Sequence, residues 1–333
     1  MMQRKIAVVG ATGMVGRTFL KILEEHDIRA EYELFASPKS AGSTLPFFGT
    51  DHIVSELKEN SFFGKGFQYA LFSAGGAISA RFAPLAAEAG AIVIDNSSQW
   101  RMDPKVPLVV PEVNPEALSE IPKGIVANPN CSTIQAVVPL KVLDDAFRIR
   151  RVVYSTYQAV SGAGQRGYQD LEDGLCGALP KKFPHPIANN CIPHIDVFLE
   201  NGNTKEEQKM IDETRKILNR PDLRVSATCV RVPVYHGHSE SINVEFERPF
   251  ELAEVFRLFE KADGIVVQDD PKNNVYPMPI FAAGTDPVYV GRIRRDASVE
   301  NGLNFWCVAD NIRKGAALNA VQIMECLMKG EQQ

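Results

Sequence analysis

Several features are missing from this sequence of 333 residues, and each absence excludes a class of protein. No apolar run approaches the length of a membrane span, and the first residues lead directly into a strand-like segment, so we expect neither a membrane helix nor a signal peptide. Basic residues are not in excess, and a formal net charge of −5 argues against nucleic acid as a partner. The six scattered cysteines form no CxxC pair, so we expect free thiols in a reducing cytoplasm and no metal site.

The first part of the chain alternates short apolar strands with helical segments. Strand patterns occur at Lys5–Gly10, Tyr32–Ala36, Tyr69–Ser73 and Ala91–Ile94, and helical patterns at Thr18–Glu25 and Ser79–Ala89. This alternation predicts an α/β fold in which helices cover both faces of a parallel sheet. We therefore expect residues 1–130 to form a Rossmann-type nucleotide-binding domain, and a helix within 315–333 to return to it.

From about Arg151 the pattern changes to strands in which polar and apolar residues alternate. These strands are expected at Arg151–Tyr157, Ala227–Pro233, Ser241–Glu247 and Tyr289–Arg294. Such alternation is typical of a mostly antiparallel or mixed sheet with one covered face. A charged amphipathic helix is expected over Thr204–Asn219, and a Gly- and Pro-rich excursion over 162–193. Residues 131–314 are thus expected to form a second domain of the α+β type.

Three glycines lie between the first strand and the first helix. Gly10, Gly13 and Gly16 form a GxxGxxG turn, which allows pyrophosphate to approach the backbone at a helix N-terminus. A cofactor with a free ribose 2′-hydroxyl would require an acidic residue after the second strand. The sequence there is Ser37-Pro38-Lys39-Ser40, with hydroxyls and a lysine, which favours NADP over NAD.

One cysteine occupies a position where a thiol can be reactive. Cys131 follows a proline-containing turn, Asn128-Pro129-Asn130, and precedes an apolar run from Ile134 to Leu143 that is expected to be helical. The positive end of a helix favours an anion, and the thiolate is the nucleophilic form of cysteine. A free cysteine can also simply pack in a core, and its position alone leaves both interpretations open.

A thiol nucleophile together with a nicotinamide cofactor indicates aldehyde oxidation through a thioester. Such a reaction needs a proton carrier, and histidine suits that task at neutral pH. Of the six histidines, His236 and His238 follow a strand that carries Arg231. Their spacing does not choose between them.

Several motifs together resemble the aspartate-semialdehyde dehydrogenase family. They are GATGMVG, SAGG at Ser73–Gly76, DNSSQWR at Asp95–Arg101, NPNCST, TYQAVSGAG at Thr156–Gly164, CVRVPV with HSES, and DNIRKGAA at Asp310–Ala317. The resemblance runs nearly end to end and keeps the family's motif order. It implies NADPH-dependent reductive dephosphorylation of L-4-aspartyl phosphate to L-aspartate 4-semialdehyde, on the route to lysine, methionine and threonine.

The resemblance also implies the roles of individual residues. Cys131 matches the nucleophile, His238 the acid/base and Gln158 the residue that orients the substrate. The residues matched to substrate binding are Arg231 for the α-carboxylate, Glu206 for the ammonium group, and Lys209, Arg101 and Asn130 for the phosphate. Without the resemblance, Glu206 and Lys209 would be an ordinary charged pair on an exposed helix.

For the cofactor, the residues expected to contribute are Gly10, Thr12, Gly13, Met14, Val15, Ser37, Lys39, Ser40, Ser73, Ser161, Gly162 and Asn311. Many relatives carry arginine where this chain has Lys39, and a lysine meets phosphate as a point charge, so selectivity for NADP over NAD is expected to be looser. The second domain is expected to be catalytic and to mediate dimerisation, giving a cytoplasmic homodimer or a tetramer built from dimers.

Two alternatives remain at this stage. N-acetyl-γ-glutamyl-phosphate reductase shares the fold and a cysteine–histidine pair, but the NPNCST and HSES motifs argue against it. A nucleotide sensor without turnover is a different class of protein. The presence of Cys131, Gln158, Arg231 and His238 together gives that alternative little support.

Overall fold

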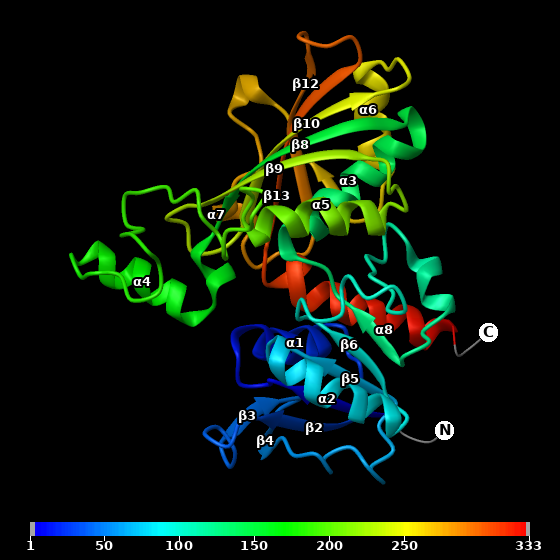
Figure 1. Ribbon diagram of the computed structural model, residues 1–333, viewed down its shortest axis with the longest axis vertical. Coiled ribbons are helices and arrows are strands. Elements are labelled where there is room, and N and C mark those ends of the chain that lie inside the picture. Colours follow the sequence, from blue (N-terminus) through cyan, green and yellow to red (C-terminus); the bar gives the residue numbers. More distant parts are fainter. Residues whose placement is uncertain (1–3, 331–333) are drawn as a thin grey trace. The chain divides into compact units, whose positions relative to one another are not determined.

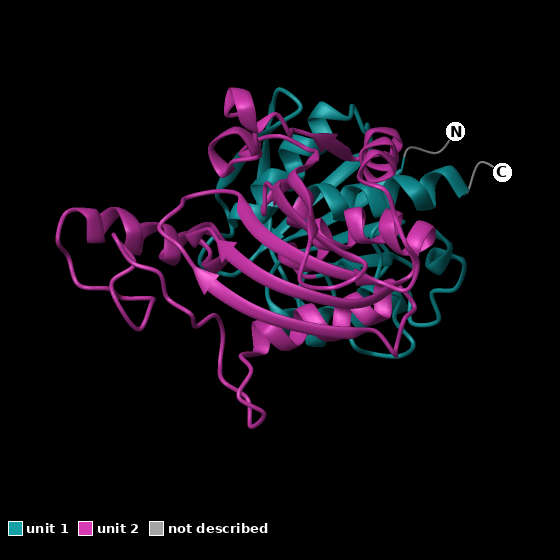
Figure 2. Ribbon diagram, turned by 90° about the horizontal axis from the view of Figure 1, so that it is seen from above, with its two compact units in different colours: residues 1–129, 316–333 teal, residues 130–315 magenta. Residues whose placement is uncertain are grey.

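The computed structural model describes residues 4–330, which divide into two compact units (Figure 2). The first unit contains the chain up to Pro129 and the segment from Ala316 on, and the second contains Asn130–Gly315. Among the described residues, no helix combines the length and the apolar character that crossing a membrane requires.

The first unit is built on a seven-stranded sheet with the order β3-β4-β2-β1-β5-β6-β7 (Figure 1). Its strands are β1 (Lys5–Val9), β2 (Glu31–Ala36), β3 (Thr44–Phe47), β4 (Thr50–Glu56), β5 (Tyr69–Phe72), β6 (Ile92–Asp95) and β7 (Ile125–Ala127). All neighbours are parallel except β3 and β4, which form an antiparallel hairpin at one edge. The predicted parallel sheet is confirmed.

Helices complete the first unit: α1 (Met14–Glu25), α2 (Gly76–Glu88) and α8 (Leu318–Gly330). Strand β1 reads KIAVV, and its last four residues are fully buried, as expected of a central strand with both faces covered. Phe19 and Leu23 of α1 and Met324 of α8 bury their side chains in one apolar core with Val8. The chain passes from β1 to opposite sides of the sheet, β2 on one side and β5 on the other, and such a switch point is where doubly wound folds bind ligands.

The second unit is built on a six-stranded mixed sheet with the order β11-β12-β13-β10-β8-β9. Its strands are β8 (Ile149–Gln158), β9 (Arg224–Arg231), β10 (His238–Phe246), β11 (Ile265–Val267), β12 (Val288–Asp296) and β13 (Gly302–Ala309). The pairs β8–β9 and β11–β12 are parallel, and the other neighbours are antiparallel. This agrees with the mixed sheet that the sequence predicts.

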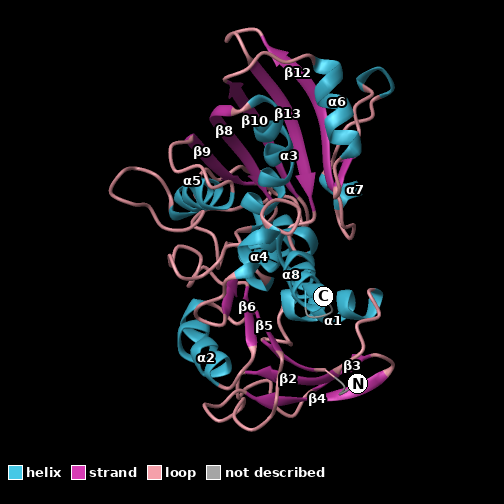
Figure 3. Cartoon of the chain, turned by 90° about the vertical axis from the view of Figure 1, so that its right-hand side faces the viewer, coloured by secondary structure: helices cyan, strands magenta, loops and turns pink. Residues whose placement is uncertain are grey.

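Helices α3 (Cys131–Phe147), α5 (Lys205–Ile217) and α6 (Leu252–Lys261) pack along one face of this sheet (Figure 3). In β10 every second residue from His238 to Phe246 is buried, because that face lies under the helices. The other face is more open, and Tyr157 and Trp306 place their rings together there at 5.5 Å between centroids.

The excursion after β8 is an ordered part of the second unit and extends away from the six-stranded sheet (Figure 2). It contains α4 (Gln165–Leu175), and the short helix α7 (Pro279–Ala282) follows later in the chain. The Asp170 carboxylate accepts hydrogen bonds from the backbone N–H groups of Lys181, Lys182 and Phe183 at 2.7–3.0 Å. These three bonds hold the return segment against α4.

Candidate active site

Cys131 is the first residue of α3, as its sequence context predicts. The N-cap residue Asn130 accepts hydrogen bonds on its side-chain oxygen from the backbone N–H groups of Ser132 and Thr133, at 3.0 and 3.2 Å. An amide cap of this kind satisfies two of the four N–H groups that a helix start leaves without partners. The thiol is therefore fixed at a well-formed helix N-terminus, where the helix dipole favours negative charge.

The thiol faces an imidazole. Cys131 Sγ lies 3.3 Å from Nε2 of His238, the first residue of β10. Nδ1 of His238 accepts a hydrogen bond of 3.0 Å from the backbone N–H of Ala159, so the neutral ring carries its proton on Nε2, toward the sulfur. Complete burial, together with the nearby Arg231 guanidinium, lowers the pKa of His238 well below its ordinary value.

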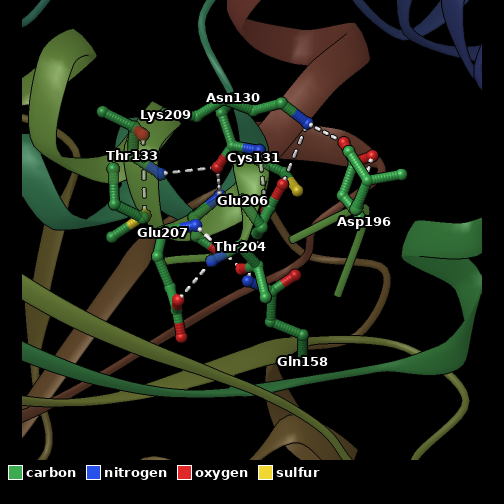
Figure 4. A network of polar contacts seen from close by, with 12 residues as sticks. Asn130, Cys131, Thr133, Gln158, Asp196, Thr204, Glu206, Glu207 and Lys209 are labelled. Carbon is green, nitrogen blue, oxygen red and sulfur yellow. Dashed lines mark hydrogen bonds and ion pairs between the residues drawn. The ribbon is translucent and has the colours of Figure 1, made fainter. Parts of the chain in front are cut away.

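A buried carboxylate, that of Glu206, connects a group of polar side chains near Cys131 (Figure 4). Glu206 Oε1 accepts from the side-chain amides of Asn130 and Gln158 at 2.9 and 3.2 Å, and Oε2 accepts from Lys209 Nζ at 3.1 Å. Burial alone would raise the pKa of Glu206, but Lys209, Asn130 and Arg231 outweigh it and hold that pKa below its ordinary value. Glu206 is thus an ionised carboxylate at neutral pH.

Arg231 ends β9 directly beside Gln158 of β8, because the parallel register pairs these two residues. Its Nη1 donates to the Ala159 carbonyl at 2.7 Å, while its buried Nε has no hydrogen-bond partner among the described residues. Burial lowers the pKa of Arg231, and the nearby Glu206 carboxylate and the Cys131 side chain oppose that effect. A guanidinium remains charged in proteins, so this side chain presents an unused donor in a mostly buried position.

Gly162, which is expected at the nicotinamide, lies next to Arg231 and His238 within the second unit. A Cβ atom on Gly162 would lie 2.8 Å from Arg231 Nη1 and 3.1 Å from His238 Cε1. The buried amide of Asn311 joins two segments, since Oδ1 accepts from the backbone N–H of Gly237 at 2.9 Å and Nδ2 donates to Ser161 Oγ at 3.0 Å. Asn311 therefore braces the loop that carries His238.

We expect Gly162→Ala to lower kcat and to raise the KM of the substrate together, by about tenfold in kcat/KM. The added methyl would displace Arg231 and His238 from their positions, and small misplacements of reacting groups can cost this much. Steady-state kinetics on the purified variant measure the effect. Gly330→Ala is the matched control, because no atom lies within 4 Å of its new Cβ, and kinetics equal to that control would contradict the steric role of Gly162.

The first unit supplies a turn suited to a dinucleotide. Gly10 has φ +84°, and a Cβ on it would lie 2.2 Å from the Ser73 carbonyl oxygen, so only glycine fits there. The N-cap of α1 is Gly13, which makes no side-chain capping bond, and the helix start passes through Met14 and Val15. Helix N–H groups without a side-chain cap are the donors that a pyrophosphate needs, so the residues present fit the cofactor. Thr12 stands half-buried at the same turn.

The segment after β2 agrees with a 2′-phosphorylated cofactor. Ser37 and Lys39 are exposed, and the Ser40 N–H closes a turn onto the Ser37 carbonyl at 2.9 Å. The turn offers hydroxyls and one lysine, with no carboxylate from Ser37 to Ser43. A phosphate fits this arrangement better than a ribose hydroxyl that requires an acidic acceptor.

The structure brings most of the expected substrate residues together, with one in the other unit. Cys131, His238, Gln158, Arg231, Glu206, Lys209 and Asn130 all belong to the second unit. Arg101 belongs to the first unit, where Nε donates to the Asn128 carbonyl at 2.9 Å and Nη2 to the Asn96 carbonyl at 3.0 Å. These backbone contacts hold its guanidinium in a fixed position.

Sequence reasoning missed several residues of this site. Asp196 accepts from Lys209 Nζ at 2.9 Å, and Glu213 accepts from the Asn130 backbone N–H at 2.6 Å. Glu213 follows Glu206 by seven residues, and that helical spacing could have placed both on one face. A Cβ on Gly315 would lie 2.9 Å from Cys131 Cβ, which explains a glycine at the end of the DNIRKG segment.

Comparisons with known proteins agree on one family. The model described as "Semialdehyde dehydrogenase, NAD binding domain" matches residues 5–121, and "Semialdehyde dehydrogenase, dimerisation domain" matches 140–314. The chain is 57% identical to aspartate-semialdehyde dehydrogenase of Aquifex aeolicus over 98% of both chains, and 50% identical to that of Campylobacter jejuni over 97% of both.

Solved structures give the same result. The Vibrio cholerae aspartate semialdehyde dehydrogenase II complexed with ASA matches with a TM-score of 0.95 and 47% identity, over 99% of both chains. The Candida albicans enzyme with NADP matches with a TM-score of 0.77 and 28% identity, over 98% of both chains.

Proposed function

The chain belongs to the aspartate-semialdehyde dehydrogenase family, and from this premise we propose how its residues carry the reaction. It is an NADP-dependent oxidoreductase of amino-acid biosynthesis that interconverts L-4-aspartyl phosphate and L-aspartate 4-semialdehyde. The observation that carries the mechanism is the 3.3 Å approach of Cys131 Sγ to His238 Nε2 beside a buried, ionised Glu206.

Cys131 is the nucleophile in this proposal. Its sulfur, as the thiolate that the helix start favours, attacks the acyl carbon of aspartyl phosphate. The carbon–oxygen bond to phosphate breaks, inorganic phosphate departs, and a thioester remains on Cys131. NADPH, when bound, supplies the hydride that reduces this thioester. His238 holds a proton on Nε2, where it meets both the sulfur and the oxyanion that forms as the thioester is reduced. The carbon–sulfur bond then breaks, the oxyanion becomes the carbonyl of aspartate semialdehyde, and Cys131 is released as the thiolate.

The substrate is held by groups of matching charge. Glu206 receives the substrate ammonium, and Arg231 takes the α-carboxylate through donors that include its unpartnered Nε. Lys209 and Asn130 receive the phosphate with Arg101 as the third contact, and Gln158 orients the acyl group. Lys209 is half-buried and forms ion pairs with Asp196 and Glu206, so a bound phosphate would replace one of these carboxylates as its partner.

We expect Arg231→Lys to raise the substrate KM by about tenfold or more, with a smaller fall in kcat. A lysine presents one point charge and cannot replace the planar pair of donors that a carboxylate binds. The measurement is the KM for aspartate semialdehyde at saturating NADP and phosphate. Arg224→Lys, at the exposed start of the same strand, serves as control. Equal KM values for both variants would remove Arg231 from the substrate site.

The proposed mechanism is tested by following the absorbance of NADPH as it forms from aspartate semialdehyde, phosphate and NADP. Omitting phosphate should stop steady turnover, because the thioester then lacks its acceptor. Replacing the substrate with N-acetylglutamate semialdehyde tests the alternative reductase chemistry, and replacing NADP with NAD tests the looser selectivity expected from Lys39. Turnover that does not depend on phosphate would contradict the proposed thioester route.

The assembly belongs to the same proposal. We propose a homodimer, or a tetramer built from dimers, formed through the open face of the six-stranded sheet in the second unit. Support comes from the dimerisation-domain match over 140–314 and from the Tyr157–Trp306 ring pair on that face. A cytoplasmic location remains part of the proposal.

A further inference from the structure

A fully buried carboxyl group lies next to the catalytic pair and has no part in the proposed mechanism. Glu240 follows His238 by two residues on β10, so both side chains point to the face that α3 covers. Among residues 4–330, seven buried side-chain atoms have no hydrogen-bond partner. Four of the seven belong to one neighbourhood: both oxygens of Glu240, Oγ of Ser132 and Oε1 of Gln135.

These three residues join the start of α3 to β10. Ser132 directly follows Cys131 and shares a helix face with Gln135, three residues later. Gln135 Nε2 donates to the His238 backbone carbonyl at 3.3 Å, and Ser132 lies close enough to Glu240 to affect its pKa. The first turn of α3 therefore rests on β10 through this group of polar side chains.

The balance of donors and acceptors in the group depends on one proton. With Glu240 ionised, its two oxygens, Gln135 Oε1 and Ser132 Oγ are four acceptors, and the Ser132 hydroxyl is the single donor among them. With Glu240 as a neutral acid, its O–H becomes a second donor and one acceptor is removed. The neutral form thus matches donors to acceptors far better, and buried polar groups that lack partners are costly.

We propose that Glu240 is kept as the neutral carboxylic acid and is a positioning residue, which fixes the first turn of α3 and thereby holds Cys131 against His238. The inference rests on the function proposed above for that pair. An ionised Glu240 would place a negative charge near the N-terminus of α3. That charge would disfavour the thiolate form of Cys131, which the helix dipole favours.

The surroundings agree with a neutral group. Burial raises the pKa of Glu240 well above its ordinary value, and the Glu206 carboxylate adds to this, whereas the neighbouring Ser132 hydroxyl, which can donate to the ionised form, partly opposes it. Among the described residues, Tyr154 of β8, Cys229 of β9 and Cys307 of β13 are further titratable side chains that interact with Glu240. Burial raises the pKa of each of them, so a phenol and two thiols, all neutral, face the acid from three strands.

A proton taken up on folding makes stability depend on pH in a defined direction. In the unfolded chain a glutamate titrates near about 4.3. Because the pKa of Glu240 is higher in the folded state, its contribution to stability is complete below the pKa of the unfolded chain. That contribution is lost as pH rises toward the folded pKa. A glutamine in the same place carries its own donor and needs no proton.

The test compares Glu240→Gln and Glu240→Ala with the unchanged enzyme. Melting temperatures from pH 5 to pH 8.5 report the proton, and iodoacetamide alkylation of Cys131 and steady-state kinetics report the position of the thiol. We expect the melting temperature of Glu240→Gln, minus that of the unchanged enzyme, to increase as pH rises. We also expect its alkylation rate and kcat to stay within about threefold, whereas Glu240→Ala lowers kcat more than tenfold with little change in KM.

The matched control is Glu245→Gln, on the same strand but on the opposite face, where the carboxylate pairs with Arg150 at 3.3 Å. This control should show no gain in melting temperature with pH. If the difference in melting temperature between Glu240→Gln and the unchanged enzyme did not change with pH, Glu240 would be ionised and the proposal would be overturned. A Glu240→Gln enzyme as impaired as Glu240→Ala would also overturn it. Melting and alkylation need no turnover, so they separate this outcome from a failure of the proposed reaction.

Discussion

Replacing Cys131 with alanine should abolish turnover while NADP binding stays nearly intact. The sulfur is the atom that forms the thioester, and alanine offers no nucleophile in its place. The helix start should survive, because Asn130 caps it through the backbone N–H groups of Ser132 and Thr133 rather than through the thiol. The measurements are the steady-state rate of NADPH formation and the dissociation constant of NADP by calorimetry.

The control for this substitution is Cys191→Ala, which removes an exposed thiol from the same unit. That variant should keep the activity of the unchanged enzyme. Mass spectrometry after mixing with aspartyl phosphate adds a direct observation, since an acyl adduct should form on the control and be missing from Cys131→Ala. Activity in the alanine variant, or an adduct on another residue, would assign the nucleophile elsewhere.

Much of the fold could be predicted because burial leaves a direct pattern in the sequence. Strand β1 is apolar throughout its buried length, and α1 repeats apolar residues on one face. The hairpin β3–β4 was not predicted, because the edge strand β3 (Thr44–Phe47) includes a proline and the burial pattern of β4 is mixed. Helix α4 was missed as well, since Gln165–Leu175 buries only a few residues.

The candidate site was less accessible to sequence reasoning, because its contacts come from register and packing. Local sequence predicts a cysteine at the start of a helix, yet His238 lies 107 positions away in the chain. Gln158 and Arg231 become neighbours only through the parallel pairing of β8 and β9. Spacing alone did not choose between the two histidines, and the family resemblance assigned His238. In the structure His238 begins a buried strand, whereas His236 is half-buried and its ring centroid lies 5.7 Å from that of Tyr168.

The second large effect is expected from His238→Asn, which should lower kcat by about two to four orders of magnitude. The shorter amide can still accept the Ala159 N–H through its oxygen, as Nδ1 does now, but it does not reach the sulfur as Nε2 does. The loss therefore reports the proton held at Nε2 rather than a collapse of the loop. His236→Asn, two residues earlier, is the control and should retain nearly full activity.

His238 also makes a prediction about stability, whose sign follows from its burial. The unfolded chain protonates this histidine near about pH 6.5, whereas burial and Arg231 hold the folded pKa well below that value. Between the two values the unfolded state binds more protons, so the free energy of unfolding falls as pH falls, by at most about 1.4 kcal/mol per pH unit. Above about pH 6.5 this group adds no further pH dependence.

His238→Asn removes that titration. Its free energy of unfolding, measured by urea denaturation from pH 5 to pH 8, should therefore decline less on acidification than that of the unchanged enzyme. The acid side of the pH–rate profile should likewise lie below the ordinary range of histidine, because protonating the ring requires Nδ1 to give up the Ala159 N–H. Parallel stability curves for both proteins, or a rate profile with a midpoint near about 6.5, would mean that His238 titrates as an exposed histidine does.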